Sequence, residues 1–212
     1  MISRFLVLIA ATCLLPQSAA AAPRIDPARL ADRAEIAALI RCYARGTDAI
    51  GNAAVETDPE SAGLEILETC FTEDATFAVW PAGTPFDSLV FPERTGDEPP
   101  ALMVRGPAAW AAATNAAFRG AGGVGYDFVQ HNISNIDVEV SGAEGRLTAY
   151  LSSVHVIQGA PGTSTRCRRE ANGVYSVKAG RVEGRWLITH LDLAQIAYDA
   201  VIENGDGCSR PR

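Results

Sequence analysis

The sequence predicts an α+β fold, with helices in the first half of the chain and antiparallel strands in the second half. Before residue 120, apolar residues recur at helical spacing in three segments. After residue 127, apolar and polar residues alternate, which is typical of half-buried strands, and turns at 141–145, 159–165 and 182–184 separate these strands. Helices followed by strands indicate a mostly antiparallel sheet in a single domain.

The predicted helices differ in length. The first covers 26–50 and has an apolar stripe made of Ile36, Leu39, Ile40, Tyr43 and Thr47. After it the sequence predicts, in order, a polar loop at 52–62, a short helix over 63–71, a turn at 72–74 and a β-prone stretch over 75–80. A third helix is expected from Gly106-Pro107 to about 120, because proline suits the first turn of a helix.

One short strand and four longer strands are predicted, over 101–105, 127–140, 146–157, 169–181 and 185–197. Residues 136–140 alternate between apolar and acidic side chains, so this stretch is half-buried. On the next strand, Leu151, Ser153 and His155 share one face. The stretch 81–100 contains five prolines and is predicted to be a long irregular loop.

The first residues have the three-part layout of a secretory signal peptide. Arg4 precedes an apolar run over 5–15, and an alanine tract at 19–22 provides a cleavage site. The apolar run is too short to span a bilayer, and the alternative is a buried N-terminal helix. The expected organisation is a signal peptide (1–22), one domain (23–200) and a C-terminal tail (201–212). We therefore expect a periplasmic or secreted protein.

The charge balance bears on the class of partner. The chain has 25 acidic and 18 basic residues, a net charge of −7, and no cluster of Lys or Arg. Such a chain is unsuited to binding nucleic acid or an anionic membrane surface, and no later apolar stretch is long enough to cross a membrane. A small molecule is the expected partner, and a homodimer or homotrimer is the expected assembly.

Four cysteines follow the signal segment: Cys42, Cys70, Cys167 and Cys208. Disulfides are permitted in an oxidising compartment, and four cysteines allow three pairings. Cys42 and Cys70 fall in helical stretches, whereas Cys167 and Cys208 fall in polar segments where a free thiol is a liability. We expect a Cys167–Cys208 bond, with four free thiols as the alternative, and the Cys and His spacings predict no metal site.

Several short phrases occur in a characteristic order between residues 32 and 190. They are Glu35-Ile36, Tyr43 to Asp48, Phe71 to Ala75, Val104 to Gly106, His131-Asn132, Val138 to Val140, Gly173 to Tyr175 and Gly184 to Trp186. In these phrases the chain resembles the SnoaL-like branch of the nuclear transport factor 2-like superfamily. The resemblance implies a cone-shaped curved sheet wrapped by three helices, with a pocket inside the cone. The loop 81–100 is longer than in a minimal member of this family, and we expect it to cover the mouth of the cone.

The chain looks most similar to the scytalone dehydratase and hexachlorocyclohexane dehydrochlorinase type, which works without metal or organic cofactor. By position, the resemblance implies that His131 is the strand histidine and Asp48 the helix aspartate. It also places His155 as a second histidine, Asn172 as a pocket asparagine and Tyr43 at a variable pocket position. Two departures limit the comparison: the dehydratase's tyrosine is Thr47 here, and the dehydrochlorinase's helix lysine is Tyr43.

The residue types fit acid–base chemistry. A neutral imidazole at His131 can take or give a proton near neutral pH, and Asp48 can orient it and stabilise the imidazolium. His155 can protonate or hold a leaving group, and Tyr43 can polarise a substrate oxygen. Tyr175 is a further substrate-binding candidate beside Asn172. The alternative for His131 is a histidine hydrogen-bonded within the sheet, and for Asp48 a surface carboxylate at a helix end. His155 and the two tyrosines would then be ordinary core residues.

The expected function is that of a cofactor-independent lyase acting on a small apolar molecule of aromatic or polycyclic type. Dehydration, dehydrohalogenation and retro-aldol loss of formaldehyde all require this same set of acid–base residues. A double-bond isomerase is the nearest alternative. A non-catalytic exported ligand-binding protein is another, and it would have a pocket without contact between Asp48 and His131.

The signal-peptide interpretation predicts a mature N-terminus between Ala19 and Ile25. The intact mass of secreted protein measures this position directly. Exported soluble protein that retains Met1 would contradict the interpretation.

Overall fold

The computed structural model describes residues 26–82, 99–119, 125–158 and 166–203. These contain three helices, α1 (Pro27–Gly51), α2 (Pro59–Leu67) and α3 (Pro107–Arg119). They also contain six strands: β1 (Phe71–Trp80), β2 (Leu102–Arg105), β3 (Phe128–Ser141), β4 (Glu144–Gln158), β5 (Arg166–Val182) and β6 (Arg185–Glu203). Most of the predicted loop 81–100, the turn 159–165, the signal segment and the end of the tail lie outside the described residues. Within the described residues no helix is long and apolar enough to cross a membrane.

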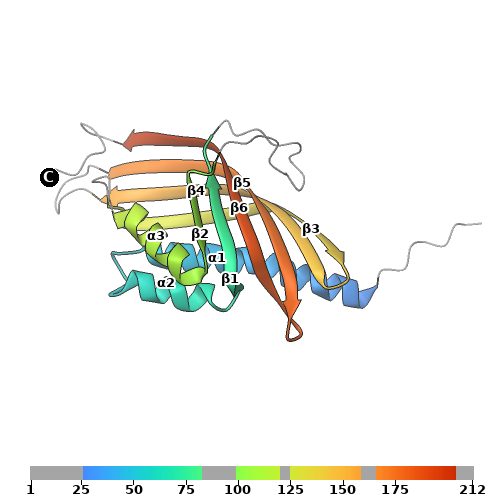
Figure 1. Ribbon diagram of the computed structural model, residues 1–212. Helices are drawn as coiled ribbons and strands as arrows, with labels where there is room; N and C mark the ends of the chain where they lie inside the picture. Colours follow the sequence, from blue (N-terminus) through green and yellow to red (C-terminus); the bar gives the residue numbers. More distant parts are fainter. Residues whose placement is uncertain (1–25, 83–98, 120–124, 159–165, 204–212) are drawn as a thin grey trace, which may run out of the picture.

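The six strands form one sheet in the order β2-β1-β6-β5-β4-β3. β3 to β6 are a continuous antiparallel meander, β2 is antiparallel to β1, and only the β1–β6 pair is parallel. Figure 1 shows the long strands curving over the helices, which gather on one side of the sheet. The predicted α+β class with a mostly antiparallel sheet is therefore confirmed.

Helix α1 is the central helix and begins and packs as its sequence predicts. The side chain of Asp26 caps it by accepting a hydrogen bond from Ala28 N at 3.0 Å, and Pro27 occupies the first turn. Its apolar stripe is buried against the sheet and α2. Gly46 permits the close crossing with α2, because a Cβ there would lie 2.8 Å from the Leu67 side chain. Leu67 itself is fully buried.

Two predictions between α1 and β1 were wrong. The second helix begins at Pro59 instead of residue 63, because Asp58 caps it by accepting from Ser61 N at 3.2 Å. It ends at Leu67 instead of residue 71. The predicted turn at 72–74 is part of β1. Phe71 pairs with β6 before these polar residues, and β1 pairs with both β2 and β6 from Thr76 onward, so the strand runs through the expected turn with an irregular register.

Cys42 and Cys70 form a disulfide, with their Cα atoms 6.3 Å apart. The bond ties α1 to the segment between α2 and β1. Cys70 lies in this turn, so the prediction that it is helical was wrong. The sequence alone did not predict this pairing. Cys208 lies outside the described residues, and its bond with Cys167 stays a prediction.

The Cys42–Cys70 bond closes a loop of 28 positions, so its loss should lower the free energy of unfolding by about 2–4 kcal/mol. The double variant Cys42→Ala/Cys70→Ala, compared with wild type by urea denaturation, measures the effect. Wild type should show the bond in a non-reducing peptide map. A map with both thiols free would contradict the assignment.

Candidate active site

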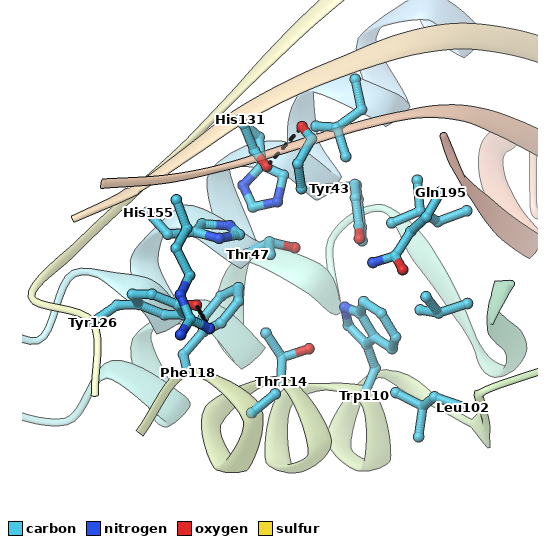
Figure 2. Close-up of a pocket in the computed structure, with 17 residues that line it drawn as sticks. Tyr43, Thr47, Leu102, Trp110, Thr114, Phe118, Tyr126, His131, His155 and Gln195 are labelled. Carbon is cyan, nitrogen blue, oxygen red and sulfur yellow. Dashed lines mark hydrogen bonds between the residues drawn. The ribbon is translucent and has the colours of Figure 1, made fainter. Parts of the chain in front are cut away.

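A cavity of about 400 Å³ lies between α1, α3 and the concave face of the sheet. Its seventeen lining residues come from all four meander strands and from β1 and β2 as well as from the two helices. Aromatic and aliphatic side chains form most of the wall, with a few polar groups aimed inward (Figure 2). This size and composition are typical of pockets for small organic molecules.

His131 and Asp48 meet at the cavity wall. Asp48 Oδ1 lies 2.7 Å from His131 Nδ1 and also accepts the His131 backbone N–H at 2.8 Å. A carboxylate only accepts, so Nδ1 carries the proton in this pair and Nε2 is left to exchange a proton with a molecule in the cavity. The His131 side chain is 6% exposed and that of Asp48 is 24% exposed. Asp48 does not line the cavity, and its influence on a bound molecule passes through His131.

The end of α1 is held against β3 by two side chains. Asp48 accepts from His131 N, and Asn52 Oδ1 accepts from Val129 N at 3.1 Å. Gly51 lies between them and allows the approach, because a Cβ there would be 2.4 Å from Val129 Cβ. The Asp48–His131 pair is thus part of the contact between helix and sheet.

His155 lies beside this pair but in a drier environment. It is 5% exposed and packs against Tyr126 and Phe118, with ring centroids 4.8 Å and 5.4 Å away. Its ring centroid is 6.0 Å from that of His131. Burial lowers the pKa of His155 to about 3, and the nearby His131 and Arg169 add to the shift. His155 is therefore neutral at physiological pH and offers a hydrogen bond rather than an imidazolium proton.

Tyr43 presents its hydroxyl to the cavity from α1 (Figure 2). Burial raises the pKa of Tyr43 to about 12, so the phenol keeps its proton. The hydroxyls of Tyr175 and Thr47 lie near enough to oppose this rise, although neither makes a hydrogen bond of standard geometry in the described structure. The pKa of Tyr175 is raised further, first by burial and then by Tyr43.

Tyr175 and Asn172, the two predicted substrate-binding residues, are not at the cavity wall. Tyr175 is fully buried and packs edge-on against the ring of Tyr43, with ring centroids 5.4 Å apart. It does not line the cavity. Asn172 follows Ala171, which lines the cavity, so alternation along β5 directs Asn172 to the opposite face. The structure therefore brings together His131, Asp48, Tyr43 and His155 but neither of these two.

Several cavity residues were missed in the sequence. Trp110 and Thr114 come from α3, Arg169 from β5 and Gln195 from β6. Trp110 and Thr114 stand four residues apart in an alanine-rich helix, and that spacing was the available signal. Thr47, which belongs to the α1 stripe and stands at the position of the dehydratase's tyrosine, also lines the cavity.

In the described ranges no three His, Cys, Asp or Glu residues are grouped so as to hold a metal ion.

Solved structures of similar fold cover most of the chain. A proposed scytalone dehydratase from Novosphingobium aromaticivorans shares 16% identity, with a TM-score of 0.52 over 86% of this chain and 93% of that one. A hexachlorocyclohexane dehydrochlorinase from Novosphingobium barchaimii shares 15%, with a TM-score of 0.53 over 82% and 92%. A proposed aromatic ring hydroxylase from Novosphingobium aromaticivorans shares 20%, with a TM-score of 0.52 over 81% and 94%. At these identities the likeness concerns the fold.

The family is identified by sequence. No curated protein matches the chain significantly. Residues 28–192, by contrast, match the SnoaL-like domain, and this region contains the cavity residues of α1 and α3 and both histidines of the site. The resemblance found in the sequence is confirmed. The protein belongs to the SnoaL-like domain family.

Proposed function

We propose that this protein is a cofactor-independent lyase in which His131 removes a proton from a bound substrate. The observation that carries the proposal is the 2.7 Å contact between Asp48 Oδ1 and His131 Nδ1 at the wall of the cavity. A histidine oriented by a carboxylate through one ring nitrogen presents the other as a base, and the carboxylate stabilises the imidazolium that forms.

The elimination can be written with the residues in place. His131 Nε2 takes a proton from a substrate carbon, the C–H electrons form the new double bond, and the bond to the leaving group breaks. Tyr43 and His155 are both neutral donors at neutral pH, and they hydrogen-bond the departing atom. The proton on His131 then passes to the leaving group or to solvent, which restores the neutral ring.

The cavity wall supports an aromatic or polycyclic substrate. Phe118, Tyr126 and Trp110 present ring faces or edges to the cavity, and Leu102 and Leu193 add aliphatic surface. Flat apolar molecules gain most from such walls, because buried aromatic pairs contribute beyond their area. Dehydration, dehydrohalogenation and retro-aldol loss of formaldehyde remain alternatives within this class.

The rival functions fit the site less well. A double-bond isomerase of this type needs a carboxylate as its base, whereas Asp48 is already hydrogen-bonded to His131 and lies behind it. A ligand-binding protein has no need for this pair. We also propose that the protein is exported, as its signal-like N-terminus and its Cys42–Cys70 bond both suit an oxidising compartment.

Removing the base should stop turnover. We expect His131→Ala to lose about 10²–10⁴-fold in kcat and Asp48→Asn about 10²-fold, with the fold preserved, since asparagine can still accept the His131 backbone N–H. Turnover of a panel of β-hydroxy ketones, chlorinated cyclohexanes and diaryl propanediols measures the effect.

The chain offers a matched control for these variants. His190 Nε2 and Asp192 Oδ2 form a second pair 2.8 Å apart, outside the cavity lining. His190→Ala and Asp192→Asn should keep wild-type turnover. Full activity in His131→Ala would contradict the lyase mechanism and favour the ligand-binding alternative.

The low pKa of His155 predicts a pH-dependent stability. Below about pH 6.5 the unfolded chain protonates this side chain, whereas the folded protein does so only near pH 3, so stability falls as pH falls through this window. His155→Phe keeps an aromatic ring against Phe118 and Tyr126 and removes the titration. Urea denaturation between about pH 7 and pH 4.5 should show a shallower slope in the variant, by up to about 1.4 kcal/mol per pH unit. Parallel slopes would show that His155 is not buried as a neutral ring.

A further inference from the structure

We propose that Trp110 and Thr114 form a hydrogen-bonding wall that receives an oxygen acceptor of the substrate, so that the substrate class is oxygenated aromatics such as aryl ethers, aryl ketones and phenols. Calling these ligands substrates rests on the proposed lyase function. The binding preference that it predicts is independent of which bond is broken.

Both side chains are buried and face the cavity from one helix. Trp110 is 4% exposed and Thr114 is 5% exposed, and both line the cavity. They are four residues apart on α3, so they lie on the same face of the helix, one turn apart. Figure 2 shows them rising from α3 on the side of the cavity opposite His131, with the amide of Gln195 reaching into the same space.

The polar atoms of these two side chains have no protein partner. Among the residues that the structure describes, neither Trp110 Nε1 nor Thr114 Oγ1 makes a hydrogen bond, and both atoms are fully buried. Buried polar groups in folded proteins are nearly always paired, because an unpaired donor loses its hydration and gains nothing in return. Two such groups side by side in a cavity indicate that a bound molecule completes them.

The direction of the indole is set by its packing. Trp110 stacks on Phe77 with ring centroids 5.1 Å apart and an angle of 8° between planes, and its ring is 6.1 Å from that of Tyr43. Phe77 is fully buried and holds this stack from the sheet. The indole N–H therefore points in a fixed direction and does not have to be ordered when the ligand binds.

The chemistry of the donors defines the ligand atom. An indole N–H only donates, so it requires an acceptor, and a ligand N–H placed there would leave it unpaired. The threonine hydroxyl can donate to that same acceptor. An ether, carbonyl or phenol oxygen meets this need on a molecule that the apolar walls otherwise favour. Held on the α3 side, that oxygen anchors one end of the substrate while the other end faces His131.

Matched ligand pairs test the preference by equilibrium binding. 2-Methoxynaphthalene and 2-ethylnaphthalene differ by an oxygen in place of a methylene, and 2-acetylnaphthalene and 2-isopropenylnaphthalene differ by a carbonyl in place of a vinylidene. Wild type should bind the oxygenated member of each pair about tenfold more tightly. Trp110→Phe and Thr114→Val should each reduce this ratio and leave the affinity for the hydrocarbons nearly unchanged.

The control removes an indole N–H elsewhere. Trp186 Nε1 donates to Asp32 outside the cavity lining, so Trp186→Phe should keep the wild-type ratio. Circular dichroism checks that each variant folds, and Thr114→Val, being isosteric, keeps the test open if Trp110→Phe is unstable. Equal binding of both members by wild type, or a ratio that survives both variants, would overturn the proposal even if lyase activity is found. A preference for the oxygenated ligands in a protein without lyase activity would sustain the oxygen site and overturn the proposed function alone.

Discussion

Helix α1 meets the sheet at β3, which is an edge strand, and this contact sets the geometry of the whole site. The outer amides of an edge strand have no neighbouring strand to bond, and here Asn52 and Asp48 accept those of Val129 and His131. The spacings agree, since four residues of helix advance about 6 Å and two residues of strand about 7 Å. Asp48 thus satisfies a backbone donor that folding requires and, through the same oxygen, orients the histidine ring.

Two places at the cavity wall can carry charge, the Asp48–His131 pair and Arg169. The Asp48–His131 pair is partly reached by solvent through the carboxylate, whereas His155 and Tyr43 are buried and stay neutral at physiological pH. A base that becomes an imidazolium beside a carboxylate creates little net charge, which an apolar cavity tolerates. The neutral groups around it supply donors without competing for the proton, an arrangement suited to elimination.

The fold alone does not choose the reaction. Structures of similar fold include proteins described as a dehydratase, a dehydrochlorinase and a hydroxylase, all at low identity to this chain. Specificity has to come from the side chains that line each cavity. In this protein α3 contributes two such groups, because the small alanines around Trp110 and Thr114 let the helix lie close to the cavity and project these two inward.

The local pattern carried most of the fold and part of the site. Periodicity placed α1, α3 and the meander strands to within a few residues, and alternation along β4 set Leu151, Ser153 and His155 on the cavity side. The family resemblance singled out His131 and Asp48. These features depend on residues close in sequence or on short motifs, so they can be predicted without knowing which elements pack together.

What only the tertiary structure decided depends on elements that meet across long separations. The Cys42–Cys70 bond requires the crossing of α1 and α2, and the start of β1 becomes a strand because neighbouring strands pair with it. Asn172 faces away from the cavity because the direction of a strand face is set by the sheet to which it belongs. The cavity itself is a space between helices and strands, and its unpaired donors on α3 become visible only when every possible partner has been placed.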